Sequence, residues 1–473
     1  MSELSVSEVF DNYFQSVGEP ASGEGRIPRP AEGEAHRGQV RIAYRVAEAH
    51  RDRLLHVADV GWHCWDGARW ALDKDGAAVR AVLATLRAAL VESVDMEKRQ
   101  RDDLQRDVRR CESDAGVRGV LALAAALPPL SATVADLDAD PYLLNTASGT
   151  VDLRTGQSRP HDPGDRITKV AGAGYVPDAG TEHWQRFLAD VLPDPDVRGF
   201  LQRLIGLSLA GKVIEHVLPI FTGTGRNGKG TFVRVVSEAL GDYAIEAEPE
   251  LFIARDRAHP TGQLDLRGVR LATCQETDDG KRLAVATVKR LTGGDVIRAR
   301  AMRQDFIEFT PSHLPILITN HLPKVPADDP ALWARLRVIP FTESFIGRED
   351  TGLEDRLRLE LAGVLAWAVA GWHDYRDRRL DEPKTVRAAT DGYRASADAL
   401  AKFIEDACTT GEFVHVGARD LFNAWQTWCL RNGETPGSER DFGPAIEARG
   451  YSRRRVNKGY RYGGLALLAD EEV

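Results

Sequence analysis

A short apolar run, a glycine-rich loop that ends in lysine, and a helix with one apolar face follow one another near the middle of the chain. Residues 218–221 read Leu-Pro-Ile-Phe, and residues 223–229 read Gly-Thr-Gly-Arg-Asn-Gly-Lys. Phe232, Val235 and Ala239 then recur at the spacing of one helix face. A strand, a glycine loop and a helix in this order constrain the surrounding fold to an α/β arrangement. Alternating strands and helices continue to about residue 345 and favour the same class.

The glycine loop has the composition of a phosphate-binding loop. Glycines let backbone N–H groups converge on phosphate oxygens, and the amino end of the following helix adds partial positive charge. Lys229 is placed to reach the β- and γ-phosphates of a nucleoside triphosphate. An accidental glycine turn is disfavoured by the three glycines, the lysine and the flanking elements. The candidate nucleotide-binding residues are Gly223, Thr224, Gly225, Arg226, Asn227, Gly228, Lys229, Gly230 and Thr231.

The position after the lysine departs from the usual pattern. It normally holds Ser or Thr, whose hydroxyl binds Mg²⁺, but here it is Gly230, followed by Thr231. Two alternatives follow. Thr231 supplies the hydroxyl from a shifted helix start, or the metal relies on water and carboxylates.

Polar residues end two further apolar runs. Residues 269–274 lead to Glu276, which we expect to hold metal and to polarise the attacking water. Residues 314–319 lead to Asn320, an amide that can orient that water. Arg335 and Arg337 come next and are candidates for a finger on a neighbour's nucleotide, the alternative being two surface arginines.

The order of these blocks resembles the superfamily 3 helicases, in particular the phage and plasmid primase-helicase branch related to the poxvirus primase-helicase. The resemblance covers residues 138–345, a little under half the chain. Its blocks are residues 149–156, 227–229, 276–277, 291–295, 309–311, 319–321 and 335–341. The resemblance implies a homo-hexameric ring that hydrolyses ATP at subunit interfaces and moves on single-stranded DNA, in the replication of a phage, plasmid or integrated element.

The same resemblance implies roles for single residues. Lys229 and Glu276 match the Walker A and B positions, Asn320 the sensor, and Arg335, with Arg337 as the rival, the arginine finger. ATP and Mg²⁺ are the implied cofactors, with Thr231 and Glu276 as candidate metal ligands. A separate primase and polymerase are the implied partners. The family often has a pair of arginines at the finger, but Ala334 precedes Arg335 here.

The net charge of −9 excludes a uniformly basic nucleic-acid coat, so DNA contact is expected at local patches. Residues 296–309 predict a hairpin, which enters the ring's pore in the resembling helicases. Its candidate DNA contacts are Arg298, Arg300 and Arg303, with Lys289 assisting. For each arginine, a solvated edge hairpin is an equal alternative.

The last module predicts helices followed by a hairpin at residues 451–462, as in a winged-helix domain. Residues 449–462 contain no acid, and the candidate contacts to duplex or forked DNA are Arg453, Arg454, Arg455 and Lys458. A plain solvated hairpin is the alternative.

The expected fold is therefore α/β: a P-loop ATPase core of the AAA+-like kind, a helical or mixed N-terminal region and a C-terminal winged-helix domain. The expected divisions are a flexible lead-in at 1–40, a helicase-associated domain at 41–180, the ATPase domain at 181–350, a helical linker at 351–394 and the winged-helix-like module at 395–473. Periodicity predicts one helix from 77 to about 113.

Other readings are weaker. Five cysteines without a CxxC pair disfavour a disulfide framework or zinc site, and no apolar run is long enough for a membrane span, so a cytoplasmic protein is expected. A primase is disfavoured because only about 135 residues precede the resembling region. An ATP-binding initiator or scaffold with little unwinding remains the alternative, and the presence of Glu276 argues against it.

Overall fold

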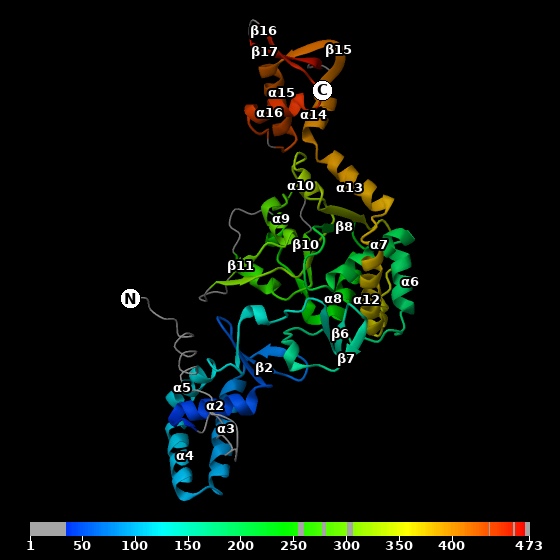
Figure 1. Cartoon of the computed structure of the whole chain (residues 1–473). Coiled ribbons are helices and arrows are strands. Elements are labelled where there is room, and N and C mark those ends of the chain that lie inside the picture. Colours follow the sequence, from blue (N-terminus) through cyan, green and yellow to red (C-terminus); the bar gives the residue numbers. More distant parts are fainter. Residues whose placement is uncertain are drawn as a thin grey trace, which may run out of the picture. The chain divides into compact units, whose positions relative to one another are not determined.

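The computed structural model describes residues 35–253, 260–276, 281–299, 306–434, 436–456 and 459–468 (Figure 1). They form two compact units. The first comprises the described residues up to 132, except for 58–60 and 65–71, and the second comprises those segments and everything from 133 onward. Among the described residues, no helix has both the length and the apolar character needed to cross a bilayer.

The first unit is a helical bundle with a small sheet. Its elements are α2 (Gly38–His50), β1 (Leu54–Val57), β2 (Gly61–Trp65), α3 (Ala77–Ser93), α4 (Lys98–Cys111), α5 (Asp114–Ala124) and β4 (Ser131–Ala132). β3 (Trp70–Leu72) lies where the chain passes between units. The single helix expected over 77–113 is wrong, because the chain turns at 94–97 and α4 packs back on α3. The lead-in expected at 1–40 is also too long, since α2 begins at Gly38; residues 1–34 lie outside the described part.

The second unit is built on a five-stranded sheet of parallel strands, in the order β14-β8-β13-β10-β9. The strands are β8 (Leu218–Thr222), β9 (Ala244–Glu246), β10 (Leu271–Glu276), β13 (Leu314–Thr319) and β14 (Leu336–Pro340). β13 is buried at every position, as expected for a strand covered on both faces. The α/β prediction for the centre of the chain is confirmed.

Four helices share the main core with this sheet: α6 (Glu182–Val191), α7 (Pro195–Ser208), α8 (Lys229–Leu240) and α12 (Leu361–Arg378). α12 contacts both α7 and α8 (Figure 1). A Cβ on Gly206 would overlap the backbone of Trp372, and one on Gly371 would overlap the carbonyl of Gln202. These glycines therefore let α7 and α12 pack backbone to backbone.

Residues 351–394 are helical, as expected, but the expected role of this segment as a linker is wrong. α11 (Leu353–Arg358) and α12 belong to the core because Val364, Leu365 and Trp372 are buried in it. α13 (Lys384–Ser396) contacts β14.

The expected domain at 41–180 is divided, because residues 133–180 belong to the second unit. They form the antiparallel strands β5 (Leu143–Thr146), β6 (Gly149–Asp152) and β7 (Gln157–Arg159). Leu144 and Val151 are buried in the main core, and the Trp372 indole N–H donates to the Leu153 carbonyl at 2.8 Å.

Smaller elements complete the central region. They are α9 (Val285–Gly293), the antiparallel pair β11 (Ile297–Ala299) and β12 (Ile307–Phe309), and α10 (Pro330–Trp333). The predicted hairpin over 296–309 is confirmed for its two strands, while residues 300–305 lie outside the described part.

The C-terminal module has a hydrophobic core of its own around Phe403, Leu421 and Ile446. Its elements are α14 (Ala399–Ala407), β15 (Cys408–Gly417), α15 (Ala418–Arg431), α16 (Glu439–Glu447), β16 (Arg453–Val456) and β17 (Gly459–Leu467). The sheet order is β15-β17-β16. The helices and the final hairpin match the prediction, but β15 was not expected, because its residues are mostly exposed and lack an alternating apolar pattern.

Candidate functional site: a phosphate-type loop at the carboxyl edge of the sheet

The loop between β8 and α8 has a conformation that requires glycine. Gly225 and Gly228 have φ values of 93° and 83°, and Arg226 between them has 47°. A Cβ on Gly223 would overlap the Asn227 amide, and one on Gly228 would overlap the Val191 side chain. The loop turns directly into the amino end of α8, where free backbone N–H groups can receive an anion.

Lys229 is a buried cation at the start of α8. Its Nζ donates to the Gly223 carbonyl at 2.8 Å and to Asn320 Oδ1 at 3.3 Å, and the residue is 5% exposed. Burial lowers the pKa of Lys229 to about 8. Among the side chains that the structure describes, only neutral oxygens contact the Lys229 ammonium, and the Glu276 side chain is not among them. A buried charge of this kind is stabilised when an anion binds.

The ends of three neighbouring strands are aligned at the same edge. Thr222 of β8 pairs with Thr319 of β13, and Thr319 pairs with Glu276 of β10. Two strand spacings separate the backbones of Thr222 and Glu276, roughly 10 Å. Asn320 follows β13 at once and reaches Lys229. The structure thus brings Lys229, Asn320 and the backbone of Glu276 to one edge; the Glu276 side chain lies outside what is described.

The contacts of the residues after Lys229 are compatible with both alternatives for the Mg²⁺ ligand, the Thr231 hydroxyl or water and carboxylates. Thr231 Oγ1 lies 3.5 Å from Glu354 Oε1, and Arg234 forms an ion pair with the same carboxylate at 2.9 Å. Gly230 has open space, since an added Cβ would come no closer than 3.9 Å to Arg234. No cluster of three or more acidic, His or Cys side chains able to hold a metal occurs among the described residues.

The two arginine candidates differ in their partners. Arg335 donates to the Thr292 hydroxyl at 3.1 Å and to the Ala331 carbonyl, both neutral acceptors. Arg337 Nε lies 3.0 Å from the Glu382 carboxylate. Arg335 precedes β14, whose first residue pairs with the first residue of β8, so it lies at the edge of the sheet opposite the loop.

The expected DNA contacts of the central hairpin are only partly described. Arg298 is exposed, lies 3.9 Å from Glu308 across the strand pair, and stacks 4.7 Å from the Phe306 ring centroid. Lys289 forms an ion pair with Asp329 at 2.6 Å, and this pair competes with any contact of Lys289 to a DNA phosphate. Arg300 and Arg303 lie outside the described residues.

The C-terminal hairpin carries an exposed row of arginines. Arg453, Arg454 and Arg455 are all exposed in β16, and Arg454 pairs in register with Arg461 of β17. Arg453 lies 4.1 Å from the Tyr460 ring centroid. In the part of the module that the structure describes, none of Arg454, Arg455 and Arg461 has an ion pair. Lys458 lies outside that part.

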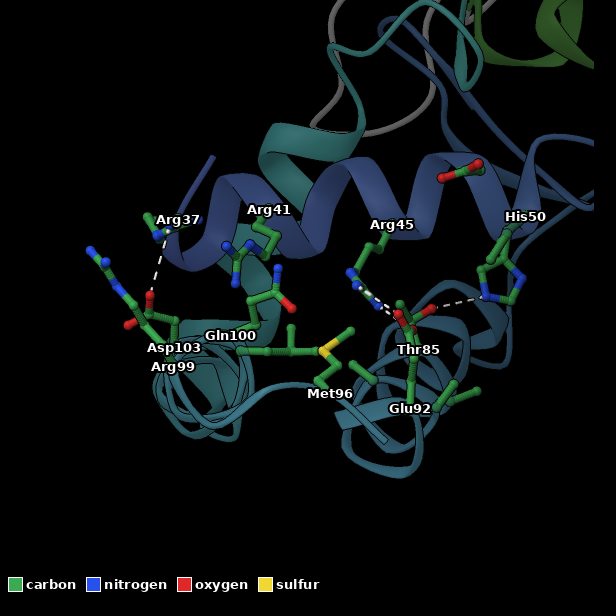
Figure 2. A pocket seen from close by; sticks show the side chains of 16 residues that line it. Arg37, Arg41, Arg45, His50, Thr85, Glu92, Met96, Arg99, Gln100 and Asp103 are labelled. Carbon is green, nitrogen blue, oxygen red and sulfur yellow. Dashed lines mark hydrogen bonds and ion pairs between the residues drawn. The ribbon is translucent and has the colours of Figure 1, made fainter. Parts of the chain in front are cut away.

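A cavity of about 900 Å³ in the first unit lies between α2, α3 and α4 (Figure 2). Arg41 and Arg45 of α2 and Arg37, which caps its amino end, line the cavity, and each is paired with an acid. The ion pairs are Arg37 with Asp103 at 3.8 Å, Arg41 with Asp107 at 3.1 Å and Arg45 with Glu92 at 2.7 Å. These ion pairs join the three helices, so the charges of the arginines are compensated within the bundle.

Sequence reasoning missed a second cavity, of about 950 Å³, beside the phosphate-type loop. Its walls come from α6 and from residues 343–356, which are distant in sequence from each other. The signal that could have located it is the apolar face of α6, whose Phe187 and Val191 lie against Gly228.

Comparison with known proteins agrees with the motifs. Residues 43–193 match the family described as D5 N terminal like, and residues 221–335 match a family of unknown function, DUF5906. The chain is 27% identical over 333 residues to "Putative helicase L207/L206" of Acanthamoeba polyphaga mimivirus, covering 64% of this chain and 35% of that protein. It is 21% identical over 333 residues to "Putative primase C962R" of African swine fever virus (strain Badajoz 1971 Vero-adapted), covering 64% of this chain and 34% of that protein.

Among solved structures, "The apo structure of NrS-1 C terminal region (305-718)" is similar at a TM-score of 0.42 and 13% identity, over 62% of this chain and 77% of that one. The chain spans about a third of the length of the curated relatives named above. The family and relative matches bear out what the motifs predict: this chain is a relative of the phage and viral primase-helicase-like branch of superfamily 3.

Proposed function

We propose that the chain is an ATP-dependent DNA helicase of superfamily 3, a homo-hexameric ring that hydrolyses ATP between subunits and moves on single-stranded DNA during replication. The observation that carries this proposal is the buried Lys229 ammonium, 3.3 Å from Asn320 at the carboxyl edge of the sheet and without a carboxylate partner among the side chains that the structure describes. Such an ammonium is suited to the β- and γ-phosphates of a nucleotide.

In this proposal, side chains and backbone groups of the chain itself have separate roles in ATP hydrolysis. Loop N–H groups and Lys229 bind the polyphosphate and stabilise charge that develops on the γ-phosphate. Asn320 orients the attacking water, and the Glu276 carboxylate polarises it. Mg²⁺, when bound with the nucleotide, neutralises phosphate charge, with Glu276 and either Thr231 or water as the ligands beyond the phosphates. For Thr231 to take part, its hydroxyl must turn away from Glu354.

The position of Arg335 supports hydrolysis between subunits. It lies one strand length from the loop, about 16 Å for five residues at roughly 3.3 Å each, which exceeds the reach of an arginine side chain. Arg335 therefore suits a neighbour's nucleotide and not its own. Its neutral partners release it more easily than Glu382 releases Arg337, so we favour Arg335 as the finger.

DNA contact is supported by the C-terminal hairpin, whose module has the helix and strand order expected of a winged helix. Arg454 and Arg461 stand directly opposite each other, and like charges in that position destabilise a strand pair. A phosphate between them would relieve the repulsion. This arrangement favours duplex or forked DNA at the hairpin and single-stranded DNA at the pore hairpin of Arg298.

The test is DNA-stimulated ATP hydrolysis by the wild type, Lys229→Ala and Glu276→Gln, with Lys402→Ala, an exposed lysine of α14, as control. Lys229→Ala should lose hydrolysis by a hundredfold or more, on the order of the loss of one transition-state donor. Glu276→Gln should bind ATP without turnover, and electron microscopy with an ATP analogue should show rings. Full turnover by Lys229→Ala, or persistent monomers on DNA, would contradict the proposal. ATP binding without any turnover in the wild type would favour an initiator or scaffold.

A further inference from the structure

The cavity of about 950 Å³ beside the phosphate-type loop has balanced charge. Its basic side chains are Arg186, Arg226, Arg348 and Arg356, and its acidic side chains are Asp190, Glu343, Glu349 and Asp350. Arg226 and Glu349 form an ion pair with each other. A cavity with equal numbers of both charges does not favour a second polyphosphate. It suits an uncharged ligand part that can stack and accept hydrogen bonds.

Both walls of the cavity are fixed directly to the loop. On one side, Val191 and Phe187 of α6 lie against Gly228, leaving no room for a side chain there. On the other side, the chain leaving β14 follows the loop: Phe341 N–H donates to the Thr222 carbonyl at 2.8 Å. The amide of Asn227 donates in turn to the Phe341 carbonyl at 3.2 Å.

The last contact of this wall positions an aromatic ring. Phe345 N–H donates to the Arg226 carbonyl of the loop at 2.9 Å, and Phe345 is half-buried against the main core. Arg348 folds back in a turn, its N–H donating to the Phe345 carbonyl at 2.9 Å. Its guanidinium carbon then lies 5.5 Å from the Phe345 ring centroid. The ring and the guanidinium form a stacking surface at the cavity, held by the backbone to the loop.

We propose that this cavity binds the nucleoside of a nucleoside triphosphate whose phosphates occupy the loop, with the base stacked on the Phe345 and Arg348 pair. This inference rests on the proposed nucleotide binding at the loop and adds where the base is held. Because both walls are attached to the loop, a ligand that enters the loop by its phosphates has its remaining part beside Phe345.

The test compares two ligands, ATP and inorganic tripolyphosphate, which share the phosphates but not the nucleoside. Their dissociation constants are measured calorimetrically for the wild type, Phe345→Leu, Phe345→Tyr and Arg348→Ala. Phe345→Leu keeps apolar packing against the core and should weaken ATP about tenfold, the size of one base–aromatic stack, with tripolyphosphate unchanged. Phe345→Tyr should bind ATP as the wild type does.

Controls separate this inference from the proposal beneath it. Phe413→Ala, at a phenylalanine 89% exposed in β15, should change neither constant. An equal loss of ATP and tripolyphosphate in Phe345→Leu would show that residue 345 supports the loop and would overturn the base site. Unchanged ATP binding in both Phe345→Leu and Arg348→Ala would overturn it as well. If the wild type binds neither ligand, the nucleotide proposal itself fails.

Discussion

Two regions of this chain contain basic side chains and differ in how those charges are compensated. The cavity of the first unit is lined by Arg37, Arg41 and Arg45, each paired with an acid of α3 or α4. Figure 2 shows the pairs of Arg37 and Arg45. The loop of the second unit buries Lys229 among neutral oxygens. Cations that are paired with acidic residues stabilise the bundle. A buried cation without an acidic partner is instead available to bind an anion. The pairing of the cations, and not their number, therefore separates the structural cavity from the proposed binding site.

The largest expected effect lies in the first unit. Arg41 and Asp107 are both almost fully buried, with side chains 5% exposed, and Arg41→Met leaves the carboxylate uncompensated. We expect a loss of about 3–5 kcal/mol in unfolding free energy. Hydrogen exchange of the α2 and α4 amides measures it within that unit.

The matched variants sharpen this prediction. Arg41→Met combined with Asp107→Leu should recover most of the loss, because a buried pair replaced by apolar side chains is often neutral. Lys229→Met should leave stability equal or higher, since it removes a buried charge that has no acidic partner among the described side chains. A large destabilisation by Lys229→Met would break the comparison.

The next effect is on the pH dependence of nucleotide binding. With the pKa of Lys229 lowered by burial to about 8, the free protein loses the ammonium as pH rises past 8, and phosphate binding requires that ammonium. We expect the ATP dissociation constant to rise about tenfold between pH 7.5 and 9, one pKa unit of deprotonation being tenfold. Titration calorimetry measures it, and Lys229→Arg should flatten the profile.

The sign of the stability effect follows from the same pKa. Because the folded pKa is below that of the unfolded chain, the unfolded state binds more protons between about pH 8 and 10.5. The stability of the free protein therefore rises with pH across that window, while nucleotide affinity falls. Affinity that stays constant up to pH 9 in the wild type would argue against Lys229 as the phosphate ligand.

The smallest effect concerns Gly230, where an added Cβ meets nothing closer than 3.9 Å. Gly230→Ala and Gly230→Ser should both fold and gain up to roughly 0.5–1 kcal/mol from helix propensity. If position 230 faces the metal, only Gly230→Ser should tighten Mg²⁺ binding with ATP, by about two- to threefold, on the order of one weak ligand. Equal Mg²⁺ affinity in both variants would leave Thr231 or carboxylates as the ligands.

Local patterns predicted the centre of the molecule well. The strand, loop and helix around Lys229 and the strands ending at Glu276 and Asn320 follow from short-range periodicity and glycine placement. The resemblance added roles for single residues. For Glu276, Arg300, Arg303 and Lys458, no described contact tests these roles. The register that brings Lys229 to Asn320 depends on strand order, which no local pattern contains.

What the sequence did not reveal depends on long-range packing. α12 was taken as a linker, although its first two-thirds are apolar on every side, which is typical of a buried helix. Its close approach to α7 depends on Gly206 and Gly371, two residues 165 positions apart in the chain. The division at residue 133 and the cavity wall at Phe345 likewise arise only when distant segments pack together.

The most direct test of Lys229 as the phosphate ligand is ATP affinity at pH 7.5, measured by titration calorimetry for the wild type, Lys229→Met and Arg45→Met. Lys229→Met removes the cation of the loop, and Arg45→Met removes one cation of the cavity in the first unit. We expect Lys229→Met to weaken ATP binding about a hundredfold or more, on the order of a lost charge-assisted contact, and Arg45→Met to bind ATP as the wild type does. ATP affinity unchanged in Lys229→Met, or lowered equally by Arg45→Met, would contradict it.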